Sequence, residues 1–184
     1  MTRLNPIESR QISPQVRAAL DKLKFEAAET PNFLRIVAKS LAAMRAFAGM
    51  EHALARGCLT AKERQQIALT VAEINGCDYC RLAHARTARE AALTDEDIRL
   101  ARKAAAAEPR ANAMLRFTQA VVLQRGEISD AELALVREAG LSESEIIEII
   151  ANIALNIFTN YLNIISKTET DFFMPQTRVL AGTN

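Results

Sequence analysis

The stretch Glu73-Ile-Asn-Gly-Cys-Asp-Tyr-Cys-Arg-Leu-Ala-His-Ala-Arg86 holds two of the three cysteines and one of the two histidines of this 184-residue chain. Asn75-Gly76 predicts the end of one helix and the start of the next. In the second helix Cys77 and Cys80 are three residues apart, and His84 follows Cys80 by four, so their side chains are expected on one face. This spacing predicts a thiol with an imidazole beside it and a second thiol within disulfide reach.

Helix-start signals recur around this stretch and indicate the fold class. Apolar residues follow each signal at helical spacing, and no segment shows the alternation typical of a strand. The sequence therefore predicts an all-α bundle of about eight to ten helices. The signals are Ser13-Pro14, Thr30-Pro31, Thr60-Ala-Lys-Glu63, Thr94-Asp-Glu-Asp97, Glu108-Pro109, Ser129-Asp-Ala-Glu132 and Ser142-Glu-Ser-Glu145.

We expect one domain over residues 1–184, with extended arms at residues 1–12 and 168–184. The first helix is expected to run to about Ala28. The next should run from Pro31 to Arg56, with a break near Gly49 and Gly57 as its C-cap. Ile146 to Ile165 is the longest apolar stretch. It has more apolar surface than a monomer core needs, which predicts burial in an oligomer.

Composition narrows the class of protein. Hydrophobic residues make up 49% of the chain and Gly is scarce, which favours close-packed helices. A net charge of +1 offers no basic surface for nucleic acid. No uninterrupted apolar run reaches about 18 residues, so no membrane span is expected. The N-terminus has no signal-peptide core, so a cytoplasmic location is predicted, where a Cys-x-x-Cys pair is typical of redox or metal chemistry.

The pattern of thiols and imidazole indicates redox chemistry. A thiolate is the nucleophile toward peroxides and disulfides, and a helix N-terminus stabilises its charge. His84 is expected to take the proton of Cys80 or to place a positive charge near it. We assign Cys80 as the attacking sulfur and Cys77 as the resolving one. An external dithiol would then reduce the disulfide through a mixed disulfide with the more accessible sulfur.

Other interpretations of the cysteine pair fit less well. A zinc site needs four ligands, and this segment offers three unless Cys58 or His52 joins them through the fold. A c-type haem needs His directly after the second cysteine, where Arg81 stands, and a thioredoxin fold needs a βαβ context. Two buried structural cysteines with a core histidine are the remaining alternative. We therefore expect neither a metal nor a bound cofactor.

Three segments together resemble a known family. Asn75-Gly-Cys-Asp-Tyr-Cys80 with His84 is similar to the signature of the alkylhydroperoxidase D-like group of the carboxymuconolactone decarboxylase superfamily. Ala154-Leu-Asn-Ile-Phe-Thr-Asn-Tyr-Leu-Asn163 and Thr168-Glu-Thr-Asp-Phe172 resemble later signatures of the same group. The resemblance implies an all-helical homo-oligomer, a trimer or hexamer or sometimes a dimer. It also implies peroxidase or disulfide-reductase activity, with electrons passing from a lipoyl or thioredoxin-like donor to a hydroperoxide or a peroxiredoxin.

One residue departs from the family pattern. The resemblance implies a proton-relaying Glu on the preceding helix, in a motif where this chain has Arg64-Gln65-Gln66-Ile67-Ala68-Leu69. Gln65 hydrogen-bonds but accepts no proton. We therefore place Gln65 in the candidate catalytic set with Cys80, Cys77 and His84. Whether Glu63 or Glu73 takes over the relay stays open at this point.

The remaining polar residues have structural interpretations. Cys58 is expected to be a semi-buried structural thiol, and Tyr79 a packing residue with a polar tip. The asparagines in the last apolar stretch are expected to bond to backbone or across an interface. They are Asn152, Asn156, Asn160 and Asn163.

Three functions follow from the sequence. The first is a thiol-dependent peroxidase or disulfide oxidoreductase of alkylhydroperoxidase type. The second is a non-enzymatic redox-sensing or interaction protein on the same fold. The third is a carboxymuconolactone decarboxylase-type enzyme, against which the redox cysteine pair argues.

Overall fold

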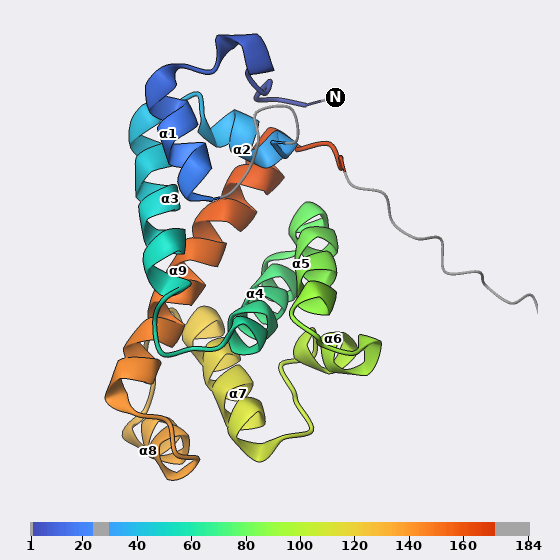
Figure 1. Cartoon of the computed structure of the whole chain (residues 1–184). Coiled ribbons are helices and arrows are strands. Elements are labelled where there is room, and N and C mark those ends of the chain that lie inside the picture. The colour runs from blue at the N-terminus through green and yellow to red at the C-terminus, as the bar shows by residue number, and fades with distance from the viewer. Residues whose placement is uncertain (1, 24–29, 172–184) are drawn as a thin grey trace, which may run out of the picture.

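The computed structural model describes residues 2–23 and 30–171, and all regular structure in these ranges is helical. A short 3-10 turn, Ser9–Gln11, precedes nine α-helices (Figure 1). The all-α fold predicted from the caps is therefore confirmed. The helices are α1 Pro14–Lys22, α2 Asn32–Val37, α3 Leu41–Leu54, α4 Ala61–Asn75, α5 Asp78–Glu90, α6 Asp95–Ala101, α7 Pro109–Leu123, α8 Asp130–Glu138 and α9 Glu143–Ser166.

Side-chain caps start most of these helices where the sequence predicts. Four helices begin with a complete capping box, in which the cap side chain and an acidic residue three positions later each bond a backbone N–H. Each box thus satisfies two donors that the first helical turn leaves unpaired. The cap residues are Thr60, Thr94, Ser129 and Ser142.

The second predicted helix is interrupted at a different place from the one expected. The break lies between α2 and α3, and Ser40 caps α3 by accepting a hydrogen bond from the N–H of Ala43. Gly49 lies inside α3, because a single glycine in a helix interior is tolerated. The C-cap of α3 is Ala55 rather than Gly57. Gly57 instead lies against the Glu148 carboxylate, at a position where a Cβ atom would collide.

The described residues include only part of the two expected arms. The N-terminal arm is not fully extended, because it contains the 3-10 turn and buries Ile12. α1 ends at Lys22, and its expected continuation to Ala28 lies outside the described residues. Thr168 to Asp171 form no helix, as predicted, and the rest of the C-terminal arm lies outside the described residues.

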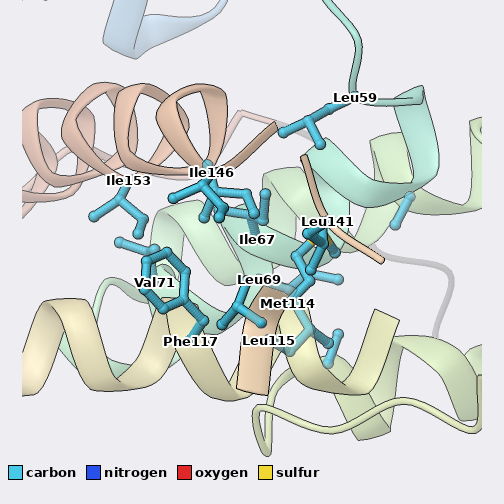
Figure 2. Packing of buried hydrophobic residues seen from close by; sticks show 14 of the residues in the cluster. Leu59, Ile67, Leu69, Val71, Met114, Leu115, Phe117, Leu141, Ile146 and Ile153 are labelled. Atoms are coloured by element: carbon cyan, nitrogen blue, oxygen red, sulfur yellow. The ribbon is translucent and has the colours of Figure 1, made fainter. Parts of the chain in front are cut away.

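Two hydrophobic cores share α9. The larger core gathers around α4, which is buried at every position from Gln66 to Ala72 because α5, α6, α7 and α9 pack around it. Figure 2 shows members of this core, among them Ile67 and Leu69 of α4, Phe117 of α7 and Ile153 of α9. The smaller core joins α1, α2 and α3 to the C-terminal half of α9. In Figure 1 α9 therefore runs diagonally from one group of helices to the other.

Among the described helices, α9 alone is long and apolar enough to cross a membrane by length and composition. Half of its most apolar window is buried inside the protein. Its Ile149 and Ile153 belong to the larger core, and Leu155 belongs to the smaller one. This pattern is typical of the core helix of a folded domain.

Candidate active site

The turn between α4 and α5 places the cysteine pair. Gly76 ends α4 in the left-handed conformation, with φ of 69°, which glycine adopts at no steric cost. The N–H of Cys77 then bonds the carbonyl of Ala72 at 3.0 Å, so α5 starts at once. Cys77 is the N-cap of α5, and its sulfur accepts a hydrogen bond from the N–H of Cys80 at 3.3 Å. The predicted helix-start position of the pair is thus confirmed, with Cys77 as the cap itself.

Cys77 and Cys80 are joined in a disulfide, with their Cα atoms 5.3 Å apart. Their exposed fractions are only 1% and 2%. Tyr79 is buried in the same cluster, and Phe33 of α2 packs against it. Both sulfurs are therefore covered in this conformation, and the expected mixed disulfide with the more accessible sulfur stays a prediction.

His84 lies one turn beyond Cys80 on α5, and its ring is held from α4. Nδ1 lies 3.0 Å from Oε1 of Gln65 on α4, and the hydroxyl of Thr87 donates to the same oxygen at 2.7 Å. This amide oxygen can accept both hydrogen bonds when Nδ1 carries the ring proton. The structure thus brings Gln65 and His84 together.

The surroundings of His84 favour its neutral form. Burial lowers the pKa of His84 to about 4, and a hydrogen bond with the Asn156 side chain opposes this only in part. The imidazole is therefore uncharged at neutral pH. These surroundings do not favour a fixed positive charge beside the sulfur.

The two carboxylates named as possible relays are engaged elsewhere. Glu63 completes the capping box of Thr60 and forms an ion pair with Arg110, which also pairs with Glu145. Glu73 forms ion pairs with Arg102 at 2.7 Å and Arg81 at 3.2 Å. Gln65 is therefore the α4 side chain that reaches the imidazole.

The asparagine row of α9 divides into two halves. Asn152 and Asn156 each donate from Nδ2 to the backbone carbonyl one turn earlier, at 2.8 Å, as predicted for buried amides. The other two asparagines reach the α4–α5 corner. Oδ1 of Asn160 accepts a hydrogen bond from Asn75 at 3.0 Å, and Nδ2 of Asn163 lies 3.5 Å from the sulfur of Cys80.

Sequence reasoning missed the contact between Asn163 and Cys80. The helical spacing of the asparagines was a visible signal, since it places them on one face of α9. Nothing in the sequence, however, says which helix that face meets.

Tyr79 has the packing role expected of it. Its ring meets Phe33 edge-on at a centroid distance of 6.1 Å, and its hydroxyl donates to Asp171 at 3.0 Å. Burial, followed by the nearby Asp171 carboxylate, raises the pKa of Tyr79 far above its usual value. Asp171 also accepts a hydrogen bond from the backbone N–H of Asn32, so the chain after α9 is tied both to α2 and to the residue between the cysteines.

Cys58 and His52 lie apart from this site. Cys58 is exposed rather than semi-buried, and its backbone N–H bonds the carboxylate of Glu148. His52 contacts Arg56 at 3.0 Å. Across residues 2–23 and 30–171, no three His, Cys, Asp or Glu side chains are grouped to hold a metal ion.

Comparisons with known proteins agree with this geometry. The model of the carboxymuconolactone decarboxylase family matches residues 40–120, which contain α3 to α6, the cysteine pair and His84. No curated protein matches the sequence significantly. The segment that carries the cysteine pair and His84 is thus similar to this family.

Solved structures of AhpD-like proteins share its fold. A peroxidase-related protein of Ralstonia eutropha JMP134, described as an alkylhydroperoxidase AhpD core, superposes with a TM-score of 0.82 at 24% identity. One from Silicibacter sp. TM1040 gives 0.80 at 22% identity, and in both cases the match covers 92% of each chain. The debrominase Bmp8 gives 0.78 at 19% identity over 93% of each chain.

Proposed function

We propose that this protein is a thiol-dependent peroxidase that uses Cys77 and Cys80 as a reversible disulfide. The observation that carries the proposal is the cysteine pair closed at the N-terminus of α5, one turn from a neutral imidazole. A helix N-terminus stabilises a thiolate, and a neutral imidazole accepts the thiol proton. The peroxidase-related proteins that share the fold support the same reaction class.

The reaction balances with the groups present in the site. In the reduced protein, the Cys80 thiolate attacks an oxygen of the hydroperoxide, the O–O bond breaks, and the alkoxide takes a proton to leave as an alcohol. Cys80 is then a sulfenic acid. The Cys77 thiol attacks its sulfur, water leaves, and the disulfide forms. The two thiols have lost two electrons and the peroxide has gained them.

An external dithiol closes the proposed cycle. A lipoyl or thioredoxin-like donor fits this step because it reduces the disulfide with two electrons through a mixed disulfide. An oxidised peroxiredoxin would take the place of the hydroperoxide as the acceptor of those electrons. No further cofactor is part of this proposal. Since both sulfurs are buried, the donor must meet a conformation in which the cover over the pair, including Tyr79 and Phe33, has moved. The reducing environment that such a cycle requires is that of the cytosol.

A second candidate, reductive dehalogenation, takes support from the debrominase that shares the fold and from the aromatic cover of the cysteine pair. In that reaction the dithiol is oxidised to a disulfide, the halogenated carbon gains two electrons and a proton, and halide leaves.

A redox sensor on this fold remains the non-enzymatic alternative, and it differs from an enzyme by stopping after one oxidation. A decarboxylase reaction makes no use of the cysteine pair.

We also propose that the protein is a homo-oligomer that buries the outer face of α9. Several large apolar side chains on this helix are exposed at helical spacing, an arrangement that single soluble chains seldom present. They are Ile147, Ile150, Phe158, Tyr161, Ile164 and Ile165.

Counting thiols tests the proposed reaction. The reduced protein should show three thiols before an organic hydroperoxide is added and one afterwards, because only the pair in α5 closes. The Cys80→Ser variant should form no disulfide at this site. Addition of a dithiol should restore the thiols and permit repeated turnover.

The same measurement separates the alternatives. Unchanged thiols in the presence of several hydroperoxides would contradict the peroxidase. The probe for dehalogenation is 2,3,4-tribromopyrrole, the compound bound in a structure of a Bmp8 variant. If two thiols per chain instead disappear with this compound, and one bromide ion is released for each disulfide formed, the electrons go to dehalogenation. A single oxidation with no turnover in excess dithiol would identify a sensor.

A further inference from the structure

The side chain of Asn163 approaches the sulfur that is expected to attack. Its Nδ2 lies 3.5 Å from the sulfur of Cys80, and it comes from α9, which is 83 residues away in sequence. A disulfide sulfur is a weak hydrogen-bond acceptor, but a thiolate at the same place is a strong one, since hydrogen bonds to charged groups are shorter and stronger. The contact would therefore strengthen when the pair is reduced.

The rest of the Asn163 amide argues against a purely structural role. The residue is only 5% exposed, yet its Oδ1 has no hydrogen-bond partner among the described residues. A buried acceptor without a partner destabilises a fold, and such atoms occur where a site has a use for them. Asn152, on the same helix, shows the alternative, because its amide bonds only to α9 itself.

The Asn163 amide is the side chain whose nitrogen lies within hydrogen-bond distance of the Cys80 sulfur. The ring of His84 is held by Gln65 and Asn156 and is neutral. Asn160 accepts a hydrogen bond from Asn75 with its Oδ1, while its buried Nδ2 has no partner among the described residues. Cys80 is only 2% exposed, so water gives its sulfur little stabilisation. The Nδ2 hydrogen of Asn163, which points at the sulfur, would offset the cost of burying a charged thiolate.

We propose that Asn163 is a further functional residue of this site, which stabilises the Cys80 thiolate by donating a hydrogen bond from Nδ2. This inference rests on the proposed thiol chemistry. In the reduced protein the amide lowers the pKa of the Cys80 thiol and so raises the fraction of attacking thiolate. Its Oδ1 is placed to accept the O–H of the incoming hydroperoxide or of the sulfenic acid that follows.

A thiol titration tests the proposal directly. In a Cys58→Ser, Cys77→Ser background Cys80 is the only thiol, and the serine introduced in place of Cys77 keeps an acceptor at the N-cap. The ultraviolet absorbance of the thiolate against pH then gives the Cys80 pKa. Asn163→Leu, which keeps a similar volume and removes the donor, should raise that pKa by about one unit, as expected for a hydrogen bond to a charged group. Asn163→Asp should raise it further, because a carboxylate opposes the thiolate.

The pH dependence of the reaction gives a second measurement. In a chain with all cysteines intact, Asn163→Leu should shift the pH profile of the peroxide reaction upward by the same amount, with about a tenfold loss of rate below the thiol pKa. Asn152→Leu is the matched control, since it removes a buried amide of the same helix that bonds only to backbone. The Cys80 pKa in the Asn152→Leu variant should equal that in the protein with Asn152 in place.

The outcomes distinguish this inference from the function on which it rests. An unchanged Cys80 pKa in both Asn163 variants would overturn it, whatever the peroxide assay shows. A shifted pKa in a protein that fails to react with any hydroperoxide would support the hydrogen bond and contradict the peroxidase. A denaturant titration of Asn163→Leu shows whether the variant is folded, and the Asp variant, which preserves the side-chain shape, repeats the test if it is not.

Discussion

At the scale of single residues, the imidazole and its amide partner set the acid–base character of the site. Gln65 supplies an oxygen to Nδ1 of His84, where a carboxylate would supply a charge. An amide fixes the ring without stabilising its protonated form, so burial decides the pKa. His84 is thus held in its neutral form at neutral pH.

The substitution Gln65→Glu should reverse this balance. A carboxylate facing Nδ1 would stabilise the imidazolium, so we expect the pKa of His84 to rise from about 4 toward or above its ordinary value of 6.5. Magnetic resonance of the two histidines measures this directly, with the exposed His52 as the internal reference. An unchanged His84 titration would show that the two side chains do not interact in solution.

The same substitution should change the acid sensitivity of the fold. In the unaltered protein the folded-state pKa of His84 lies below the unfolded value, so the unfolded chain binds more protons between pH 6.5 and 4. The free energy of unfolding should therefore fall as pH drops through this window, by at most about 3 kcal/mol from this residue, and show no further loss from it below pH 4. Urea titrations at several pH values should find a smaller loss in Gln65→Glu.

At the scale of elements, the corner between α4 and α5 fixes the position of the cysteine pair. Gly76 has a positive φ, and the next residue is already the N-cap of α5. Because no loop separates the helices, α4 carries Gln65 and α5 carries His84 toward each other. The sequence signals for this corner were strong, since Asn-Gly after an apolar helix indicates a left-handed cap.

Two glycine substitutions should have opposite effects on stability. Gly76→Ala should lower the free energy of unfolding by about 1 kcal/mol, because alanine is strained at this φ although space around the new Cβ is open. Gly49→Ala, inside α3 and also without a close neighbour, should raise it by about 0.5–1 kcal/mol. Chemical denaturation of both variants checks the pair. Equal effects of the same sign would contradict the conformational explanation.

Helix boundaries were predictable where a cap has a distinctive side chain and less so elsewhere. The boxes at Thr60, Ser129 and Ser142 start helices as expected, because their hydrogen bonds are local. The break at Ser40 was missed, since a serine within an apolar periodic pattern competes with a nearby glycine for the role of a stop signal. The site residues were likewise predictable where the pattern is local. Spacing along α5 placed the cysteines and the histidine together, whereas contacts from α9 depend on packing between segments that are distant in sequence.

At the scale of the whole molecule, α9 serves two environments. One face joins both cores and carries the asparagine row to the site, and the other leaves apolar side chains exposed. A second chain covering that outer face would bury it, which is the basis of the proposed oligomer.

A charge on the outer face of α9 should reduce association. Ile150 is 46% exposed, and Ile150→Lys should shift the protein toward smaller species in analytical ultracentrifugation, because a buried unpaired charge is costly at an interface. Leu135→Lys is the matched control on a different helix, α8, where the side chain is 62% exposed. A monomer in both the unaltered protein and the Ile150→Lys variant would contradict the proposed oligomer.

The loop before α4 affects the number of free thiols that an oxidation experiment would measure. The Glu148 carboxylate accepts hydrogen bonds from the backbone N–H groups of Cys58 and Leu59. Partial desolvation, together with that carboxylate, raises the pKa of the Cys58 thiol. A thiol held in its protonated form reacts slowly with oxidants, since the anion is the reactive species. This third sulfur should therefore stay reduced while the others cycle, and it serves as an internal standard against which each round of oxidation is measured.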